Sequence, residues 1–428
     1  MKTQKPYLNS NTDQSTVSDK TCSSNSTSTS SLSFIWFGAG VSIAEIITGT
    51  YFAPLGFAKG LIAIVTGHLI GAVLFFLTGF IGAKTKKSAM QTVGLSFGKN
   101  GILFFASLNI LQLVLWTSIM IYDGAVSLNG IFACGKWFWC FVTGGLIFVW
   151  IVLRFKNVSF VNRIAAGLLF VLSVVLCIVI FINARESGFC LFNNVGSLPD
   201  SELHIDGDVL SFGAAVELGV AMPLSWLPLV SDYTRDAERP LAGSAGCTLT
   251  YFFVSVWMYA VGMSAAIFTS ESDIALIMVK AGLGITALFI IVLSTVTTTF
   301  LDAWSTGVSS EVFSKKINAK TVSLVTVVLG TFLAFVFNMD DITDFLYFIG
   351  SVFTPMAAVM IADFYFTKSS SEEKKIDWVA AVLWCVGFIL YRFLMKVDLL
   401  TGCTSVCMII TVILTITVRV IEKRVIKK

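Results

Sequence analysis

A carboxylic acid lies inside the first long apolar stretch of the sequence. Glu45 belongs to the segment WFGAGVSIAEIITGT and lies 11 residues beyond Phe34, near the start of that stretch. A helix rises ~1.5 Å per residue, so Glu45 lies ~17 Å into a hydrocarbon core ~30 Å thick, where ionisable groups are costly and usually functional. Ser42 shares its helical face. The pair can bind a ring amine, attract a cation or exchange a proton; the alternative is a buried acid satisfied by a neighbouring helix.

A second pair of residues suits recognition of a flat heterocycle. In NILQLVLW, Gln112 and Trp116 are four residues apart and therefore share a helical face. A side-chain amide can read the donor and acceptor edge of a ring, and an indole offers a face for stacking. The alternative is a Gln that packs between helices and a Trp that faces lipid.

A third group of residues carries oxygen ligands. In VLSTVTTTFLDAWSTG, Ser294, Thr297 and Thr298 follow the spacing i, i+3 and i+4, which puts three hydroxyls on one face. Together with carbonyls freed at a helix break, they can hold a dehydrated Na⁺. Alternatively, such hydroxyls bond back to their own helix or to a neighbour. Asp302, four residues beyond Thr298, is a second deep acid, available for a cationic substrate or a coupled proton.

One motif points to an enzyme instead. Asp340, Asp341 and Asp344 have the DDxxD spacing with which membrane prenyltransferases chelate Mg²⁺ and a diphosphate. The sequence places the motif in a short connection without a second acidic cluster, where capping the next helix is the simpler role. Nine scattered cysteines show no metal-binding spacing and read as apolar packing residues. We therefore expect no cofactor other than a coupling ion, Na⁺ or H⁺.

The composition places these residues in a membrane. Hydrophobic residues make up 56% of the chain and charged residues 13%, about half of what a soluble domain carries. The chain is therefore predicted to be an all-α polytopic membrane protein. Its net charge of +3 is too small to suggest nucleic acid as a partner. Residues 1–31 are polar and rich in Ser, Thr and Asn, and we expect them to form a disordered cytoplasmic tail.

The apolar stretches predict about twelve spans. They lie near 33–57, 60–83, 101–130, 137–154, 160–184, 208–230, 246–269, 281–310, 321–338, 343–367, 377–395 and 402–421. Most Lys and Arg residues fall in alternate connections and in the tail that follows the last span, which predicts that both termini are cytoplasmic. A bacterial inner membrane is the expected location.

Two of these spans are predicted to be interrupted. The first contains GAG, TGT and Pro54, and the sixth contains Pro223 and Pro228. A matched pair of broken helices points to a transporter site at the midplane of the membrane. The transporter domain, 32–428, then divides into two five-helix repeats, 32–184 and 207–367, and two extra helices at 376–422. The equivalence of the repeats is inferred from position only.

These segments together resemble a known family. WFGAGVSIAEIITGT, IGAKT, PLVSDYTR, VTTT and FLYFIGSVFTPMAAVMIADFYF are similar to the corresponding segments of the nucleobase:cation symporter-1 family. Within it the chain most resembles a group named CytX, which is thought to carry hydroxymethylpyrimidine and is related to the cytosine permeases. The resemblance runs from about Phe34 to the end and is weakest in the last two spans.

The resemblance implies a LeuT-like fold of five plus five inverted helices with two more, and a site between spans one, three, six and eight. By the family pattern, carbonyls of Gly38 and Val41 complete a Na⁺ shell with the three hydroxyls of span eight. Trp116 matches the stacking Trp of span three. Gln112 matches the nearby Gln, with a spacing one residue longer than in cytosine permeases.

Span six departs from the family pattern. Where the family has an aromatic residue nine positions before the span-six Asp, this chain has Pro223, flanked by Met222, and Trp226 one turn later is the expected replacement. Ser225 matches a pocket serine of cytosine permeases. After VTTT, Asp302 falls in a stretch that is rich in Asn in those permeases. A pocket that gains acids and loses Asn suits a ligand with more donors or positive charge than cytosine.

We therefore expect a monomeric permease that imports a small pyrimidine, such as hydroxymethylpyrimidine, thiamine or a cytosine-like base, coupled to Na⁺ or H⁺. The expected substrate residues are Ser42, Glu45, Gln112, Trp116, Met222, Ser225, Trp226 and Asp302. Three alternatives stay open: an amino-acid permease of the same architecture, a prenyltransferase-like enzyme that uses the DDxxD motif, and a channel.

Overall fold

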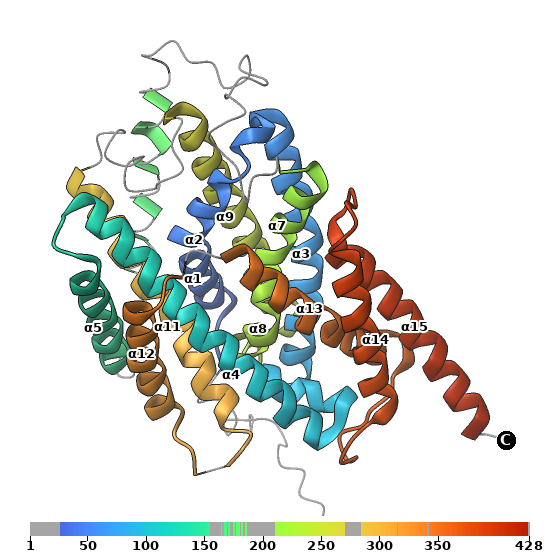
Figure 1. The fold of residues 1–428 in the computed structure, drawn as a ribbon. Helices are drawn as coiled ribbons and strands as arrows, with labels where there is room; N and C mark the ends of the chain where they lie inside the picture. The colour runs from blue at the N-terminus through green and yellow to red at the C-terminus, as the bar shows by residue number, and fades with distance from the viewer. Residues whose placement is uncertain are drawn as a thin grey trace, which may run out of the picture.

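The computed structural model describes residues 26–154, 210–269, 284–314, 316–339 and 342–426, with scattered helical positions between 164 and 185. The chain is built from helices (Figure 1). In chain order they are α1 (Thr29–Gly40), α2 (Ile43–Thr50), η1 (Ala53–Leu55), α3 (Phe57–Thr85), α4 (Ala89–Ile131), α5 (Lys136–Arg154), α7 (Phe212–Ser225), α8 (Leu227–Thr234), α9 (Pro240–Thr269), α11 (Gly284–Ser310), α12 (Ala319–Val336), α13 (Ile342–Ile361), η2 (Ala362–Thr367), α14 (Trp378–Leu394) and α15 (Gly402–Ile426).

Each predicted span other than 160–184 overlaps one of these helices or a run of consecutive ones. The predicted span 101–130 is the part of α4 that follows a kink at Gly98. The span predicted at 160–184 lies largely outside the described residues. Within the described part, eight helical segments are long and apolar enough to cross a membrane, and α1 with α2 makes a ninth when counted as one bent span. The helix α14 is apolar but has only 17 residues.

The first predicted interruption separates α1 from α2. Only Val41 and Ser42 lie between them, and the two helices meet at a bend of 48°. The hydroxyl of Ser42 caps α2 by accepting the backbone N–H of Glu45 over 3.2 Å. The break therefore has a local chemical cause, because a Ser side chain satisfies an N–H at the new helix start.

The first helix also begins earlier than predicted. Ser28 caps α1, and Thr27 pairs through its backbone with the loop after α8, accepting from the N–H of Glu238 and donating to the carbonyl of Asp236. Residues 26–31 are thus placed against the bundle, although the composition predicted a tail up to residue 31. Backbone pairing and a Ser cap outweigh the polar composition of this short stretch.

The second interruption is shallower than the first. Trp226 alone separates α7 from α8, and its φ of −85° and ψ of −12° remain in the helical region. Pro223 and Pro228 remove backbone donors on either side of it. Segment 212–234 therefore still forms a single span. In its most apolar stretch of 18 residues, 94% of the residues are buried.

The helices that carry the expected site lie in the interior of the bundle. In Figure 1, α1, α2 and α8 lie behind α4 and α13, with α5 and α12 at one edge and α14 and α15 at the other. The close approach of α3 to α7 requires glycine, since a Cβ at Gly67 would lie 2.4 Å from the carbonyl oxygen of Val216. The central helices therefore touch through their backbones.

Three basic connections meet at one end of the bundle. Lys86 Nζ donates to the carbonyl oxygen of Ala237 over 2.6 Å, and Lys87 forms an ion pair with Glu372. These contacts join the loops after α3, α8 and η2. Three of the loops that the Lys and Arg count assigned to one side of the membrane thus lie together.

The last two helices are anchored to the bundle at both ends. Near one end, the carboxylate of Glu217 on α7 accepts hydrogen bonds from the Tyr391 hydroxyl and the Thr404 N–H, both at 2.9 Å. At the other end, Arg419 is 2% exposed and binds Asp363 with two hydrogen bonds of 3.0 Å and Asp377 at 3.2 Å.

Asp377, in the loop before α14, is one partner of Arg419. Burial alone would raise the pKa of its carboxyl. Hydrogen bonds from Lys374, Ser371 and the Ala380 N–H, with the charge of Arg419, instead hold that pKa well below its usual range. Asp377 therefore remains ionised and keeps its ion pair with Arg419 at neutral pH.

Candidate functional site

A small cavity lies where the two helix interruptions meet α4 and α11. Its free volume is about 20 Å³, room for about one water molecule. The lining residues are Ser42, Ala44, Glu45, Trp116, Met120, Met222, Ser225, Trp226, Thr298 and Asp302. The structure thus brings seven of the eight expected substrate residues together around one space, and a substrate larger than water requires the walls to move.

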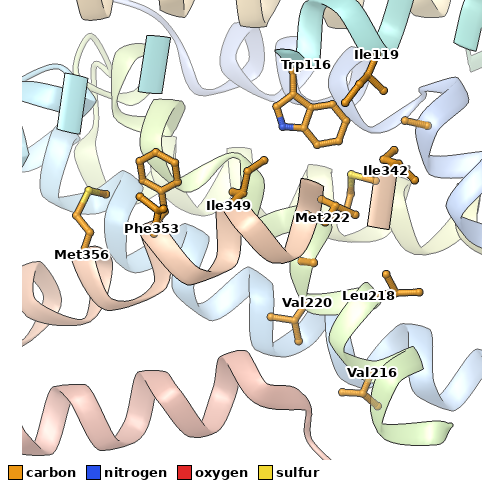
Figure 2. Packing of buried hydrophobic residues seen from close by; sticks show 14 of the residues in the cluster. Trp116, Ile119, Val216, Leu218, Val220, Met222, Ile342, Ile349, Phe353 and Met356 are labelled. Atoms are coloured by element: carbon orange, nitrogen blue, oxygen red, sulfur yellow. The ribbon is translucent and has the colours of Figure 1, made fainter. Parts of the chain in front are cut away.

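The walls of the cavity are aromatic and thioether side chains. Figure 2 shows the indole of Trp116 extending from α4 toward Met222 of α7. Phe345 of α13 approaches the same indole edge-on, with ring centroids 5.3 Å apart. Trp226 forms another wall, and its Nε1 donates to the Tyr251 hydroxyl over 2.8 Å. The Trp226 indole is therefore held in a fixed orientation.

Gln112 is the expected substrate residue that does not line the cavity. It is buried one turn from Trp116, and its Nε2 donates to Asn109 Oδ1 over 2.7 Å. Asn109 in turn donates to Ser309 Oγ and to the carbonyl oxygen of Pro228. Because Gln112 precedes Trp116 by four residues, it lies one turn away from the cavity along α4. There it takes part in a polar contact that connects α4 to α8 and α11. Asn109, three residues before Gln112, was the signal in the sequence for this contact.

Glu45 is fully held by other side chains. It is 1% exposed, its Oε1 accepts a hydrogen bond of 2.6 Å from the Tyr251 hydroxyl, and its Oε2 lies 2.7 Å from Ser255 Oγ. The same Ser255 oxygen lies 2.7 Å from His68 Nε2. Sequence reasoning missed these α9 and α3 partners. Their signal was the presence of isolated polar residues in otherwise apolar spans.

Asp302 lines the same cavity, but unlike Glu45 it is not hydrogen-bonded by other side chains of the described residues. Its side chain is 3% exposed, and its carboxyl forms no side-chain hydrogen bond or ion pair within the described residues. The nearby Thr306 hydroxyl bonds the backbone carbonyl of Asp302, not its carboxyl. Ser225 donates to the carbonyl oxygen of Met222 over 2.7 Å, which leaves its oxygen lone pairs free to accept. Asp302 and Ser225 therefore offer an acid and a hydroxyl acceptor to a ligand with donor groups.

The expected cation ligands lie between α1 and α11. The Thr298 hydroxyl is 3.4 Å from the carbonyl oxygen of Gly38, and Val41 lies in the non-helical break. Ser294 Oγ is buried with no hydrogen-bond partner in the described part of the chain. Thr297 instead bonds back to the Leu293 carbonyl over 2.8 Å. The unpartnered hydroxyl of Ser294 and the approach of Thr298 to the Gly38 carbonyl fit the ligand chemistry of a small hard cation.

The DDxxD motif gains no support from the structure. Asp344 lies in the first turn of α13, and Asp340 and Asp341 fall outside the described residues. Among the residues that are described, no three His, Cys, Asp or Glu side chains are grouped to hold a metal ion.

Comparison with known proteins gives consistent results. Residues 20–397 match the model of the family described as "Permease for cytosine/purines, uracil, thiamine, allantoin". The cytosine permease of Escherichia coli (strain K12) is 23% identical over 363 residues, which cover 83% of this chain and 84% of that one.

Two solved structures share the fold. A nucleobase-cation-symport-1 family transporter, in a closed conformation with bromovinylhydantoin bound, superposes with a TM-score of 0.75 and 17% identity over 94% of this chain and 92% of the other. A Na⁺-coupled sialic acid symporter gives a TM-score of 0.67 at 13% identity, over 92% and 89%. The prediction of an all-helical polytopic membrane protein with a LeuT-like fold is therefore confirmed.

Proposed function

Because the chain belongs to the family of permeases for cytosine/purines, uracil, thiamine and allantoin, we propose that it imports a small pyrimidine by cation-coupled alternating access. Family membership makes it a multi-pass membrane transporter of nucleobase-type substrates, not an enzyme. The finer proposal is a substrate with an amine or a positive charge, such as hydroxymethylpyrimidine or thiamine. The observation that carries it is the carboxyl of Asp302, which faces the same cavity as the Trp116 indole without a hydrogen-bonding side chain in the described residues.

In this proposal each wall has a separate role. Trp116 stacks on the ring, Met222 and Trp226 enclose its other face, and Ser42 and Ser225 accept from its edge. Asp302 binds the amine, a charge-assisted hydrogen bond that is stronger than a neutral one. Gln112 contributes to the edge only in a state in which its bond to Asn109 has opened.

The proposed Na⁺ site uses Gly38, Val41, Ser294, Thr297 and Thr298. The unpartnered Ser294 hydroxyl and the close approach of Thr298 to Gly38 support it. A cation there connects α1 to α11, so its binding favours one arrangement of the two helices. H⁺ is the alternative coupling ion. The proposed location is a bacterial inner membrane with both termini cytoplasmic, as a monomer.

The amino-acid permease alternative is less well supported by the same geometry. A substrate carboxylate needs free backbone N–H groups at the first helix break, and the Glu45 N–H there is already bound by the Ser42 hydroxyl. Two further carboxyls, Glu45 and Asp302, line the cavity and would repel the substrate's own.

A thermal-shift screen of the purified chain tests the proposal. Pyrimidines, thiamine and amino acids are compared, each with and without Na⁺. A ligand at about 100 times its Kd stabilises by about 2.7 kcal/mol, so a substrate stands out from isosteres. Stabilisation by an aminopyrimidine that disappears in Trp116→Ala supports the proposal. Stabilisation by amino acids alone overturns it in favour of the alternative permease.

A further inference from the structure

Five hydrogen bonds form one continuous chain from the cavity wall to the interior of α3. The chain runs from Trp226 Nε1 to the Tyr251 hydroxyl, then to Glu45, Ser255 and His68, and ends at the Ile64 carbonyl, which lies 2.9 Å from His68 Nδ1. Tyr251, Glu45, Ser255 and His68 are at most 2% exposed. Their hydrogen bonds must therefore be satisfied among themselves.

The two ends of the chain fix the direction of its outer bonds. An indole N–H only donates, so the Tyr251 hydroxyl accepts from Trp226 and must give its own hydrogen to Glu45 Oε1. A backbone carbonyl only accepts, so His68 Nδ1 must carry a hydrogen to bond Ile64.

The two middle bonds then lack one proton. Ser255 Oγ is 2.7 Å from Glu45 Oε2 and 2.7 Å from His68 Nε2, but its single hydrogen can serve only one of them. With Glu45 ionised and His68 neutral, the other contact would bring two lone pairs together at 2.7 Å. The contact becomes a hydrogen bond only if Glu45 is a carboxylic acid or His68 is an imidazolium.

Both permitted forms contain the same extra proton and have no net charge. One is neutral Glu45 with neutral His68, and the other is a carboxylate paired through Ser255 with an imidazolium. The missing-proton form would leave an uncompensated negative charge deep in the membrane, which is expensive.

The titratable groups around the hydrogen-bond chain also favour the forms that contain the extra proton. The titratable groups facing Glu45 are Tyr251 and Tyr259 on α9, His68 on α3 and, across the cavity, Asp302 on α11. Neither tyrosine supplies a positive charge, and Asp302 can add only a negative one. Among the described residues, no neighbouring group therefore supplies a positive charge to balance an ionised Glu45. Only the extra proton within the hydrogen-bond chain can do so.

The geometry points to a coupling proton stored between Glu45 and His68, which enters and leaves through the cavity and travels with the substrate. Glu45 lines the cavity, whereas His68 does not, so the carboxyl is the group that exchanges the proton with water and the imidazole is the internal reservoir. The proton is bound and released as O–H or N–H, and the substrate is chemically unchanged. This inference rests on the proposed function, and it uses none of the residues of the proposed Na⁺ site.

Reconstitution into liposomes tests the permease function and the proton coupling separately. Labelled hydroxymethylpyrimidine is the probe, the membrane potential is clamped at zero, and each assay is run with and without Na⁺. Exchange at equal pH tests transport itself. With the outside about one pH unit more acidic, one proton per substrate predicts about tenfold accumulation. Exchange without any effect of the pH gradient overturns proton coupling but leaves the permease function standing. If the wild-type protein exchanges neither hydroxymethylpyrimidine nor, in the same assay, labelled thiamine or cytosine, the proposed function is overturned.

Two variants test the residues. His68→Gln and Ser255→Ala are expected to keep exchange and to lose the tenfold accumulation, whereas Thr78→Val, a buried hydroxyl of α3 bonded only to its own helix, keeps both. Full proton-driven accumulation in His68→Gln overturns the assignment. If both variants fail to exchange, spectroscopy decides. In His204→Gln, where His68 is the single histidine, we expect either the ¹⁵N signals of an imidazolium or an infrared carboxylic-acid band that disappears when Glu45 is also changed to Gln; a neutral imidazole together with an ionised Glu45 overturns the proposal.

Discussion

The carboxyl groups of Glu45 and Asp302 line the same cavity, and within the described residues only that of Glu45 is held by other side chains. Glu45 accepts from Tyr251 over 2.6 Å and contacts Ser255 at 2.7 Å, whereas Asp302 faces the space without such partners. Under the proposed function the two acids therefore have different tasks: Glu45 belongs to a hydrogen-bond chain, and Asp302 binds the ligand.

Glu45→Gln should abolish or severely weaken uptake while leaving folding intact. The amide has the same shape, accepts from Tyr251 and donates to Ser255, so the chain stays bonded, but it can neither ionise nor release a proton. Labelled uptake in cells and the unfolding temperature of the purified variant are the two measurements. Wild-type uptake in this variant would argue against any functional role for the acid.

Asp302→Asn should weaken binding of a cationic or amine-bearing substrate. A charge-assisted hydrogen bond contributes about 1.5–3 kcal/mol, so Kd should rise roughly ten- to a hundredfold. Titration by calorimetry gives the change directly. Asp344→Asn, an exposed acid at the start of α13, is the matched control and should bind normally. Equal losses for a cationic ligand and a neutral one would contradict a role in charge recognition.

Trp116→Ala should remove the stacking face. Base–aromatic stacking contributes about 1–3 kcal/mol per base, and Trp116→Phe should recover most of that loss because a ring remains. Kd measured for both variants checks the order. Trp378→Ala, where the indole is 70% exposed, is the control and should leave affinity unchanged. If Phe were no better than Ala, the residue would act through packing against Phe345 instead.

Thr298→Val should weaken cation and substrate binding together. Its hydroxyl approaches the Gly38 carbonyl at 3.4 Å, and coupling between two bound ligands is reciprocal in free energy. Substrate Kd is measured across Na⁺ concentrations, and the Na⁺ dependence should flatten. Thr306→Val, on the same helix, serves as the comparison. A variant that lost substrate affinity but kept its full Na⁺ dependence would exclude this hydroxyl from the cation site.

Arg419→Met should destabilise the chain strongly, because Asp363 would be left as a buried carboxylate without its cation and Asp377 would keep only Lys374 as its cation. Breaking one partner of a buried ion pair costs about 3–5 kcal/mol. Unfolding temperature in detergent is the measurement, with Arg419→Lys expected between wild type and Met. Arg419→Met with wild-type stability would show that Lys374 and Ser371 suffice for Asp377.

The same cluster predicts a response to acid. The pKa of Asp377 is lower in the folded chain than its ordinary value of 3.8. Its stabilising contribution is therefore complete above about pH 4 and is lost as the pH falls through the lowered value. Unfolding temperatures are measured between about pH 3 and 8. Protonation of Asp377 should lower them only in the most acidic samples. A loss already near pH 6 would have to come from another residue.

Local spacing was enough to single out Ser42, Glu45, Trp116 and Asp302, which line the cavity. The roles of Met222, Ser225 and Trp226, and the meeting of spans one, three, six and eight, were expected from the family resemblance and not from spacing. Hydropathy was enough for the spans, because an apolar stretch of about 20 residues has few alternatives in a membrane. The tail boundary failed because a single Ser cap and a backbone pairing are invisible in composition.

The partners of Glu45 could not be predicted in the same way. Tyr251, Ser255 and His68 belong to α9 and α3, and which residues face each other across three helices depends on rotation and tilt, which no single helix encodes. Gln112 does not line the cavity for a related reason. It lies on the same face of α4 as Trp116 but one turn away along the helix, and only Trp116 reaches the cavity.

The anchoring of α14 and α15 through Glu217 and Arg419 has a consequence for genetics. Neither helix contributes a residue to the cavity, yet both bind Glu217 of α7, and α15 also binds Asp363 of η2. A random-mutagenesis selection for cells that no longer take up a toxic pyrimidine analogue would therefore recover alleles in this hairpin alongside alleles of the substrate pocket. Such alleles would lower the amount of carrier in the membrane rather than its affinity.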